Sequence, residues 1–111
     1  MSKLLSVAAF VIVFEAIVFA QGTYTVKDED FGCTDRDKFE RLVRYITDRD
    51  KEAFQKTLDA GLLRGDCIIF KVGDEVYLED SGGIFSGVVK LRPKGSTQEF
   101  WTFRETIHGR R

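Results

Sequence analysis

The amino-acid sequence predicts an α+β protein in which an N-terminal helical hairpin packs on a small antiparallel β-barrel. Residues 33–62 carry apolar side chains at helical spacing, whereas residues 67–108 form short alternating segments separated by turn residues. The length of 111 residues and the net charge of -1 leave room for one domain. We expect this single domain to comprise residues 21–111, behind a cleavable N-terminus.

Residues 1–20 are predicted to be a secretory signal peptide. A short basic start precedes the apolar run from Leu4 to Phe14, and Val18 and Ala20 supply the small residues of a cleavage site after Ala20. A membrane anchor is the competing interpretation. A spanning helix needs about 20 mostly apolar residues, however, and Glu15 interrupts this run. We therefore expect a secreted or periplasmic protein with no stable membrane insertion after cleavage.

Cys33 and Cys67 are the only cysteines in the chain, and we expect them to form a structural disulfide between the two halves. Exported proteins fold in an oxidising environment, and the spacing is unlike that of a Cys-x-x-Cys redox pair. Cys33 follows a charged stretch, residues 21–32, which is expected to be an extended, partly mobile lead-in. With a single histidine, the chain has too few soft ligands for a structural zinc site, so no metal or cofactor is predicted.

Two helices are predicted between the cysteines. The first spans residues 35–46, with Thr34 as its N-cap. The second is capped by Thr47 or Asp48 and ends at Gly61, a residue type that favours a helix C-terminus. Their apolar side chains form one stripe, which we expect to bury against the strands in a single shared core. The stripe comprises Phe39, Leu42, Val43, Ile46, Phe54 and Leu58.

Short strands follow from residue 67 onward, because apolar and polar residues alternate between turn-forming stretches. The predicted strands are residues 67–70, 75–79, 85–92 and 98–103, with a last short strand at 106–107. Alternation in the final aromatic run puts Trp101 and Phe103 on one face, which either the hairpin covers or a partner meets. Pro93 and Gly95 suit a type I turn between two of these strands.

The strand half resembles the Src-homology-3-like domains of bacteria. The run Gly73-Asp74-Glu75-Val76-Tyr77-Leu78 is similar to the strand that opens many of them, and residues 88–92, Gly95, Trp101 and Ile107 are similar to their later strands. This resemblance covers residues 67–108 and implies a Src-homology-3-like barrel with a peptide-binding groove. The helix-plus-barrel layout is also similar to small exported bacterial proteins of unknown role. One departure is Phe100, since these domains often carry glycine before the late tryptophan.

The candidate binding surface combines aromatic and basic residues of the strand half. Aromatic side chains and arginine are the usual anchors of a binding surface. The candidates are Tyr77, Phe85, Lys90, Arg92, Trp101 and Arg104.

No pattern in the sequence indicates catalysis. His108 is the only histidine and lies near the C-terminus, where we expect an exposed side chain rather than a base. The tripeptide Arg64-Gly65-Asp66 matches an integrin-binding motif, but a turn between helix and strand explains it.

We therefore expect non-catalytic binding of a protein, a peptide or a cell-envelope component, with an inhibitor-like role as one case. Two other functions stay open. One is a small hydrolase that uses carboxylates such as Asp74, Glu75 or Asp80, and the other is a purely structural envelope protein. Nucleic acid is not expected as a partner, because the net charge of -1 lacks a basic excess.

Overall fold

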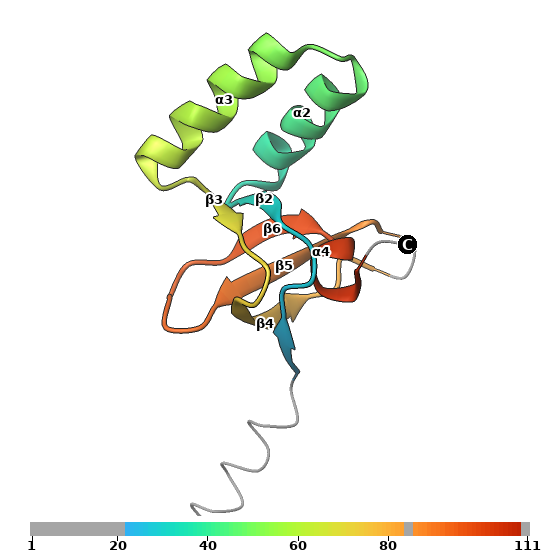
Figure 1. Cartoon of the computed structure of the whole chain (residues 1–111), viewed down its shortest axis with the longest axis vertical. Helices are drawn as coiled ribbons and strands as arrows, with labels where there is room; N and C mark the ends of the chain where they lie inside the picture. The colour runs from blue at the N-terminus through green and yellow to red at the C-terminus, as the bar shows by residue number, and fades with distance from the viewer. Residues whose placement is uncertain (1–21, 84–85, 110–111) are drawn as a thin grey trace, which may run out of the picture.

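The computed structural model describes residues 22–83 and 86–109, and the predicted signal peptide lies outside them. The described part is α+β, with a helical hairpin above a six-stranded antiparallel sheet (Figure 1). The elements are β1 (Thr23–Thr25), β2 (Asp30–Cys33), α2 (Arg36–Thr47), α3 (Lys51–Arg64), β3 (Cys67–Phe70), β4 (Glu75–Asp80), β5 (Val88–Pro93), β6 (Phe100–Phe103) and α4 (Glu105–His108).

The sheet is open, with the strand order β1-β4-β5-β6-β2-β3 and with β1 and β3 at its edges. The predicted barrel is therefore not confirmed. The sheet is nevertheless curled. The evidence is that Val26 beside β1 and Phe70 at the end of β3, from the two edges of the sheet, belong to one buried cluster. The buried side chains of this first core are Val26, Phe70, Val76, Val89, Leu91, Phe100 and Ile107.

Residues 22–32 are largely extended, as expected, but they are not a lead-in to the fold, because β1 and β2 are strands of the sheet. β1 has the sequence Thr-Tyr-Thr, residue types that favour strands, and it pairs with β4. β2 lies between β3 and β6, where Gly32 permits close packing. A Cβ atom at position 32 would lie 2.7 Å from the Phe70 ring and 3.0 Å from the Trp101 carbonyl oxygen. The partners that order these strands are distant in the sequence.

The helices are close to their predicted positions, but their caps differ. Asp35, not Thr34, caps α2, since its carboxylate accepts a hydrogen bond of 2.9 Å from the Asp37 N–H. Asp50 caps α3, because its side chain accepts a hydrogen bond of 3.0 Å from the Ala53 N–H. The cap predicted at Thr47 or Asp48 is therefore two or three residues too early.

The second helix does not stop at Gly61, as the sequence predicts, but continues to Arg64 and ends at Gly65. Gly65 has a φ of 78°, the left-handed conformation typical of a residue after a helix. Gly61 has another role, because it lies where α3 crosses the disulfide.

A second core lies between the hairpin and the opposite face of the sheet. α2 packs on β2 and β6, and α3 packs on β3. The ring of Phe31 lies at its centre, with ring centroids 5.3 Å from Phe39 and Phe54 and 5.5 Å from Phe103. The fully or nearly fully buried side chains are Phe31, Cys33, Phe39, Leu42, Leu58 and Cys67.

The expectation of a single shared core is therefore wrong. Successive side chains of a strand point to opposite faces, so the sheet separates two apolar clusters. Phe39, Leu42 and Leu58 of the predicted stripe are buried, but Ile46 is 48% exposed, because it lies at the end of α2 that points away from the sheet.

The predicted short strand at residues 106–107 is wrong, since α4 occupies that position. A buried polar network holds this helical turn on the sheet. The Thr106 hydroxyl donates a hydrogen bond of 2.9 Å to the Asp30 carboxylate in β2. The Thr102 hydroxyl in β6 donates one of 2.8 Å to the Phe31 carbonyl oxygen. These bonds satisfy polar groups inside the fold and connect three elements.

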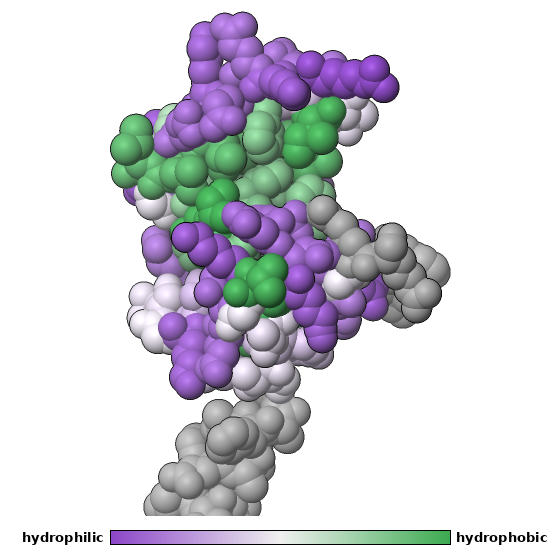
Figure 2. All heavy atoms as spheres, viewed as in Figure 1, coloured by the Kyte–Doolittle hydropathy of each residue, from purple (hydrophilic) through white to green (hydrophobic). Residues whose placement is uncertain are grey.

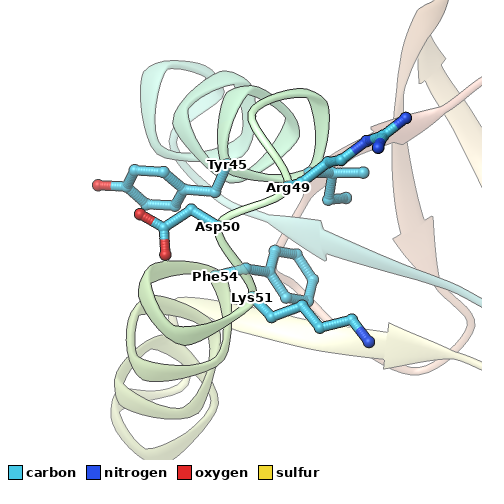
Figure 3. Close-up of a pocket in the computed structure, with 6 residues that line it drawn as sticks. Tyr45, Arg49, Asp50, Lys51 and Phe54 are labelled. Carbon is cyan, nitrogen blue, oxygen red and sulfur yellow. The ribbon is translucent and has the colours of Figure 1, made fainter.

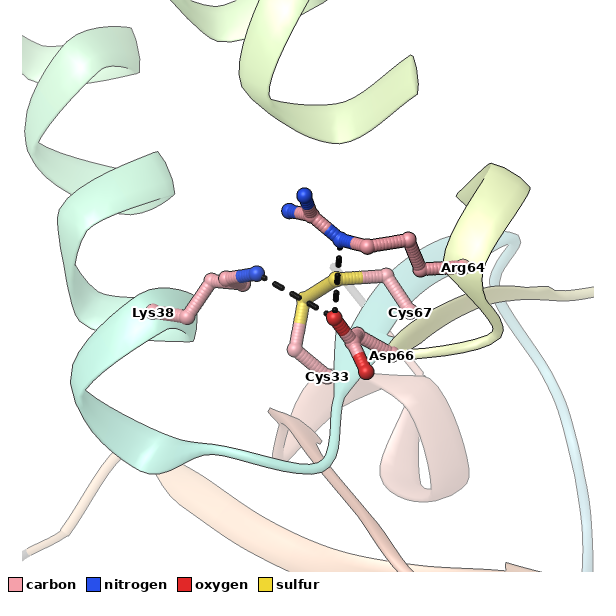
Figure 4. A network of polar contacts seen from close by, with 5 residues as sticks. All are labelled: Cys33, Lys38, Arg64, Asp66 and Cys67. Atoms are coloured by element: carbon pink, nitrogen blue, oxygen red, sulfur yellow. Dashed lines mark hydrogen bonds and ion pairs between the residues drawn. A yellow bond between two sulfur atoms is a disulfide. The ribbon is translucent and has the colours of Figure 1, made fainter. Parts of the chain in front are cut away.

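The predicted disulfide between Cys33 and Cys67 is confirmed. The two residues lie directly opposite each other on β2 and β3, with Cα atoms 4.0 Å apart. Beside them, the Asp66 carboxylate forms ion pairs with Lys38 at 3.5 Å and with Arg64 at 3.2 Å (Figure 4). The disulfide and these ion pairs together fix the base of the hairpin to the sheet.

Candidate functional site

The sheet face that carries the hairpin is not fully covered. The hairpin packs on β2, β3 and β6, and the same face continues over β4 and β5. The strand register places Tyr77 opposite Arg92, and Lys90 opposite Trp101. Four of the six predicted surface residues therefore share one face, which we call the β4–β5 face.

Cations stack on both aromatic rings of the β4–β5 face. The Arg92 guanidinium lies 4.5 Å from the centroid of the Tyr77 ring. The Lys90 ammonium lies 5.1 Å, and the Arg36 guanidinium 4.9 Å, from the centroid of the Trp101 ring. These contacts are cation–π interactions, which hold the aromatic and basic side chains in fixed orientations.

Ion pairs across the strands neutralise the β4–β5 face. Arg92 contacts Glu79 at 2.8 Å, and Lys90 contacts Glu99 at 3.4 Å. A third pair joins Lys94 to the Glu75 carboxylate at 2.8 Å, and this hydrogen bond raises the pKa of Lys94 above its ordinary value of 10.5. The face thus offers many hydrogen-bonding groups but little net charge.

An open groove borders the β4–β5 face at the β1 edge. Its cavity volume is about 790 Å³, and it passes over the Tyr77 ring and the Glu75–Lys94 pair. Thr23 and Thr25 form its other wall, since they lie opposite Tyr77 and Glu75 in the register. The groove extends the surface that the four predicted residues form.

The two remaining predicted residues do not join this face. Phe85 lies outside the described residues. Arg104 precedes α4 and lines a different cavity of about 370 Å³ together with Tyr24, Val89 and His108. Because Val89 belongs to the first core, this cavity lies on the opposite face of the sheet.

A second surface, at the tip of the hairpin, was not expected from the sequence. Tyr45, Ile46 and Phe54 line an apolar cleft of about 410 Å³, with Arg49 and Lys51 extending on either side of the Phe54 ring (Figure 3). The band of apolar side chains on the hairpin continues beyond this cleft (Figure 2). Leu63, near the other end of α3, is 89% exposed. The only sequence signal was that Ile46 falls in the last turn of its helix.

The carboxylates considered for a hydrolase have local structural partners. Asp74 accepts a hydrogen bond of 3.0 Å from the Lys71 N–H, and Asp80 accepts one of 2.8 Å from the Gly82 N–H. Glu75 pairs with Lys94. Within residues 22–83 and 86–109, no group of three or more His, Cys, Asp or Glu side chains could hold a metal ion.

The Arg64-Gly65-Asp66 tripeptide serves the turn between α3 and β3, as expected. The Arg64 side chain bonds to the Asp66 carboxylate of the same motif at 3.2 Å, and Lys38 shares that carboxylate (Figure 4). Both charged groups of the motif are therefore engaged within the protein.

The disulfide bears on the compartment of this protein. The disulfide is typical of proteins in oxidising, extracytoplasmic environments. Of the helices that the structure describes, none has the length and apolar character needed to cross a membrane.

Comparison with known proteins finds no matching family model, no matching curated protein and no matching solved structure.

Proposed function

We propose that this protein is a secreted or periplasmic, non-catalytic binding module that engages its partner through the β4–β5 face. The observation that carries the proposal is the alignment of Tyr77, Arg92 and Lys90 on β4 and β5, which the hairpin leaves uncovered, with Trp101 beside them where α2 meets the sheet. Tyrosine, tryptophan and arginine dominate the binding energy of protein interfaces. Here they are already oriented by stacking and ion pairs, so ordering them on binding costs little entropy.

The chemistry of the face favours a protein, a peptide or another polar cell-envelope component. Each of its basic residues Lys90, Arg92 and Lys94 is paired with a carboxylate. A polyanion such as nucleic acid gains affinity when unpaired basic groups of the protein displace its counterions, so this neutral surface disfavours it. An inhibitor-like role, in which the face covers the active site of an enzyme, agrees with the same chemistry.

Two features support the proposed location outside the cytoplasm. The disulfide closes at the base of the hairpin, and the sequence of residues 1–20 has the pattern of a signal peptide.

A hydrolase is less well supported, because Asp74, Glu75 and Asp80 each stabilise a turn or a strand pair rather than converging on a cleft. A purely structural envelope role gives no reason for the stack of Arg92 on Tyr77 on the uncovered part of the sheet.

We also propose that residues 67–108 are related to Src-homology-3-like domains. The curled antiparallel sheet around the first core supports this relationship. Tyr77, one of the aromatic residues that the resemblance offers for a peptide-binding groove, lines the groove at the β1 edge. The binding proposal does not depend on it.

The proposed function can be tested by affinity capture from envelope extracts and culture medium of the native host. The bait is the full, disulfide-bonded chain, compared with the double variant Lys90→Glu/Arg92→Glu. We expect a partner that the wild type retains and the double variant loses. The control is Lys56→Glu on the exposed side of α3, which should retain the same partner. Equal capture by the wild type and the double variant would overturn the proposal.

A further inference from the structure

β1 leaves one backbone edge free within the part of the chain that the structure describes. Among the described strands β1 pairs only with β4, and alternate residues of β1 form the backbone hydrogen bonds to β4. The Leu78 N–H donates to the Gly22 carbonyl oxygen at 3.4 Å, and the Val26 N–H donates to the Asp74 carbonyl oxygen at 2.8 Å. In an antiparallel ladder the residues between these positions direct their N–H and C=O groups outward. Thr23 and Thr25 therefore present backbone donors and acceptors at the edge of the sheet.

Two cavities flank this edge, one on each face of the sheet. The groove of about 790 Å³ lies on the side of Thr23, Thr25 and Tyr77. The cavity of about 370 Å³ lies on the side of Tyr24, whose side chain points the other way. A strand added beside β1 would place its alternate side chains over these two cavities in turn.

The two cavities differ in chemistry, which indicates what the added strand should carry. The smaller cavity has an apolar floor that includes Leu78 and Val89, with the cationic Arg104 and His108 at its rim. No carboxylate lines it among the described residues, and the structure gives Arg104 no ion pair there. The larger groove is lined by threonine and tyrosine residues, and the cation and the carboxylate in its lining are paired with each other.

We propose that β1 binds an extended peptide segment of a partner protein as an additional strand of the sheet. Acidic and apolar side chains of the segment would lie over the cavity of Arg104 and His108, and small polar side chains over the groove beside Tyr77. Strand addition of this kind takes affinity from main-chain hydrogen bonds and specificity from the pockets for alternate side chains. The inference rests on the proposed protein-binding function but uses the β1 edge and the cavity of Arg104 on the opposite face of the sheet, and it shares with the β4–β5 face only the groove beside Tyr77.

The test uses the full, disulfide-bonded chain, labelled with nitrogen-15, and the synthetic peptide acetyl-Thr-Glu-Thr-Leu-Thr-Glu-Thr-amide. We expect saturable amide shifts at Thr23 and Thr25, with half-saturation below about 1 mM. The same peptide with lysine in place of both glutamates should bind about tenfold more weakly, because it meets Arg104. Absence of saturable shifts at β1 up to several times that concentration, or equal binding of the two peptides, would overturn the proposal.

Two variants separate strand addition from other modes of binding. Thr25→Pro removes an outward N–H, which a strand at a sheet edge tolerates, and it should abolish the shift of the Thr23 amide, whereas Thr25→Val should keep that shift. If Thr25→Pro does not fold, Arg104→Glu decides, because it should reverse the preference between the two peptides. Lys56→Glu, on the exposed side of α3, should bind the peptide as the wild type does. The peptide titration is independent of the affinity capture with Lys90→Glu/Arg92→Glu, so failure of this inference is distinguishable from failure of the proposed function.

Discussion

Gly61 in α3 lies directly against the sulfur of Cys67 in β3. A Cβ atom at position 61 would stand 2.7 Å from the Cys67 Sγ and 3.2 Å from its Cβ. Real side chains do not approach so closely, so the hairpin can sit this near the sheet only because position 61 has no side chain. The sequence suggests a helix end at this glycine, but its structural role is to let the helix pass over the disulfide.

Gly61→Ala should therefore destabilise the protein. In an exposed helix interior the same change is expected to stabilise by about 1 kcal/mol, because alanine is the better helix former. Here the added methyl group must displace α3 or the disulfide, and overpacking of this kind costs about 1–3 kcal/mol. Urea denaturation of the two proteins measures the difference. A higher midpoint for the alanine variant would show that the hairpin has room to move away from the sheet.

Removal of the disulfide should cost a large part of the stability. Cys33 and Cys67 are 34 residues apart in the sequence, and in the chain-entropy model closing such a loop contributes roughly 3–4 kcal/mol. Cys33→Ala/Cys67→Ala should lower the free energy of unfolding by about this amount. Wild-type protein unfolded in the presence of a reductant is the control and should show the same loss. Unchanged stability in both cases would mean that the ion pairs of Asp66 and the apolar core hold the hairpin by themselves.

Phe39→Ala tests the core between the hairpin and the sheet. The Phe39 side chain is 0% exposed, and its ring centroid lies 5.0 Å from that of Phe103. Truncation should leave a cavity and cost about 3–5 kcal/mol. Arg41→Ala, on the exposed side of the same helix, should change the free energy of unfolding by no more than about 0.5 kcal/mol. Lys38 is not a suitable control, since it is paired with Asp66.

The pairing of Lys94 with Glu75 predicts a measurable titration. The hydrogen bond and the charge of Glu75 raise the pKa of Lys94 above 10.5. A cation whose pKa is higher in the folded state stabilises the fold below its unfolded pKa, and this contribution is lost as the pH rises through the folded value. NMR titration of the Lys94 side chain should give a pKa above 10.5, and Glu75→Gln should lower it. An equal pKa in both proteins would show that the pair does not persist in solution.

Local sequence patterns predict the helical hairpin and the disulfide. The positions of β1 and β2 and the open form of the sheet depend instead on pairing between distant strands, which local patterns do not show. Phe39 and Leu42 are buried as their helical spacing predicts. β1 and β2 were missed because their partners β4 and β3 lie far along the chain, and a charged run separates the two strands. The openness of the sheet likewise depends on edge contacts between distant strands.

The candidate site also has one part that the sequence predicts and another that it does not. Alternation along β5 places Lys90 and Arg92 on one face, so their common surface could be predicted. The choice of Trp101 and Tyr77 as their opposite residues depends on the register of three strands, which no local pattern encodes. The cleft at the hairpin tip was missed because Ile46 continues the apolar stripe, and only the placement of the hairpin on the sheet shows that it is exposed.

The Thr102 hydroxyl carries the last prediction, because it is buried and bonded across the sheet. It donates to the Phe31 carbonyl oxygen at 2.8 Å and lies 3.3 Å from the Thr106 hydroxyl, which in turn bonds to Asp30. Thr102→Val keeps the shape of the side chain but leaves the carbonyl oxygen without this donor, a loss of about 1–3 kcal/mol. Thr102→Ser keeps the donor and should lose less.

The exposed Thr25→Val supplies the matched control, since the same change at the sheet edge removes no bond within the fold. Its free energy of unfolding should stay within about 0.5 kcal/mol of the wild type. Hydrogen exchange gives a second measurement, because α4 is held by the network and its amides should exchange faster in Thr102→Val than in the wild type. If Thr102→Val were as stable as the wild type and its α4 amides equally protected, apolar packing of Ile107 in the first core would be sufficient to hold α4 on the sheet.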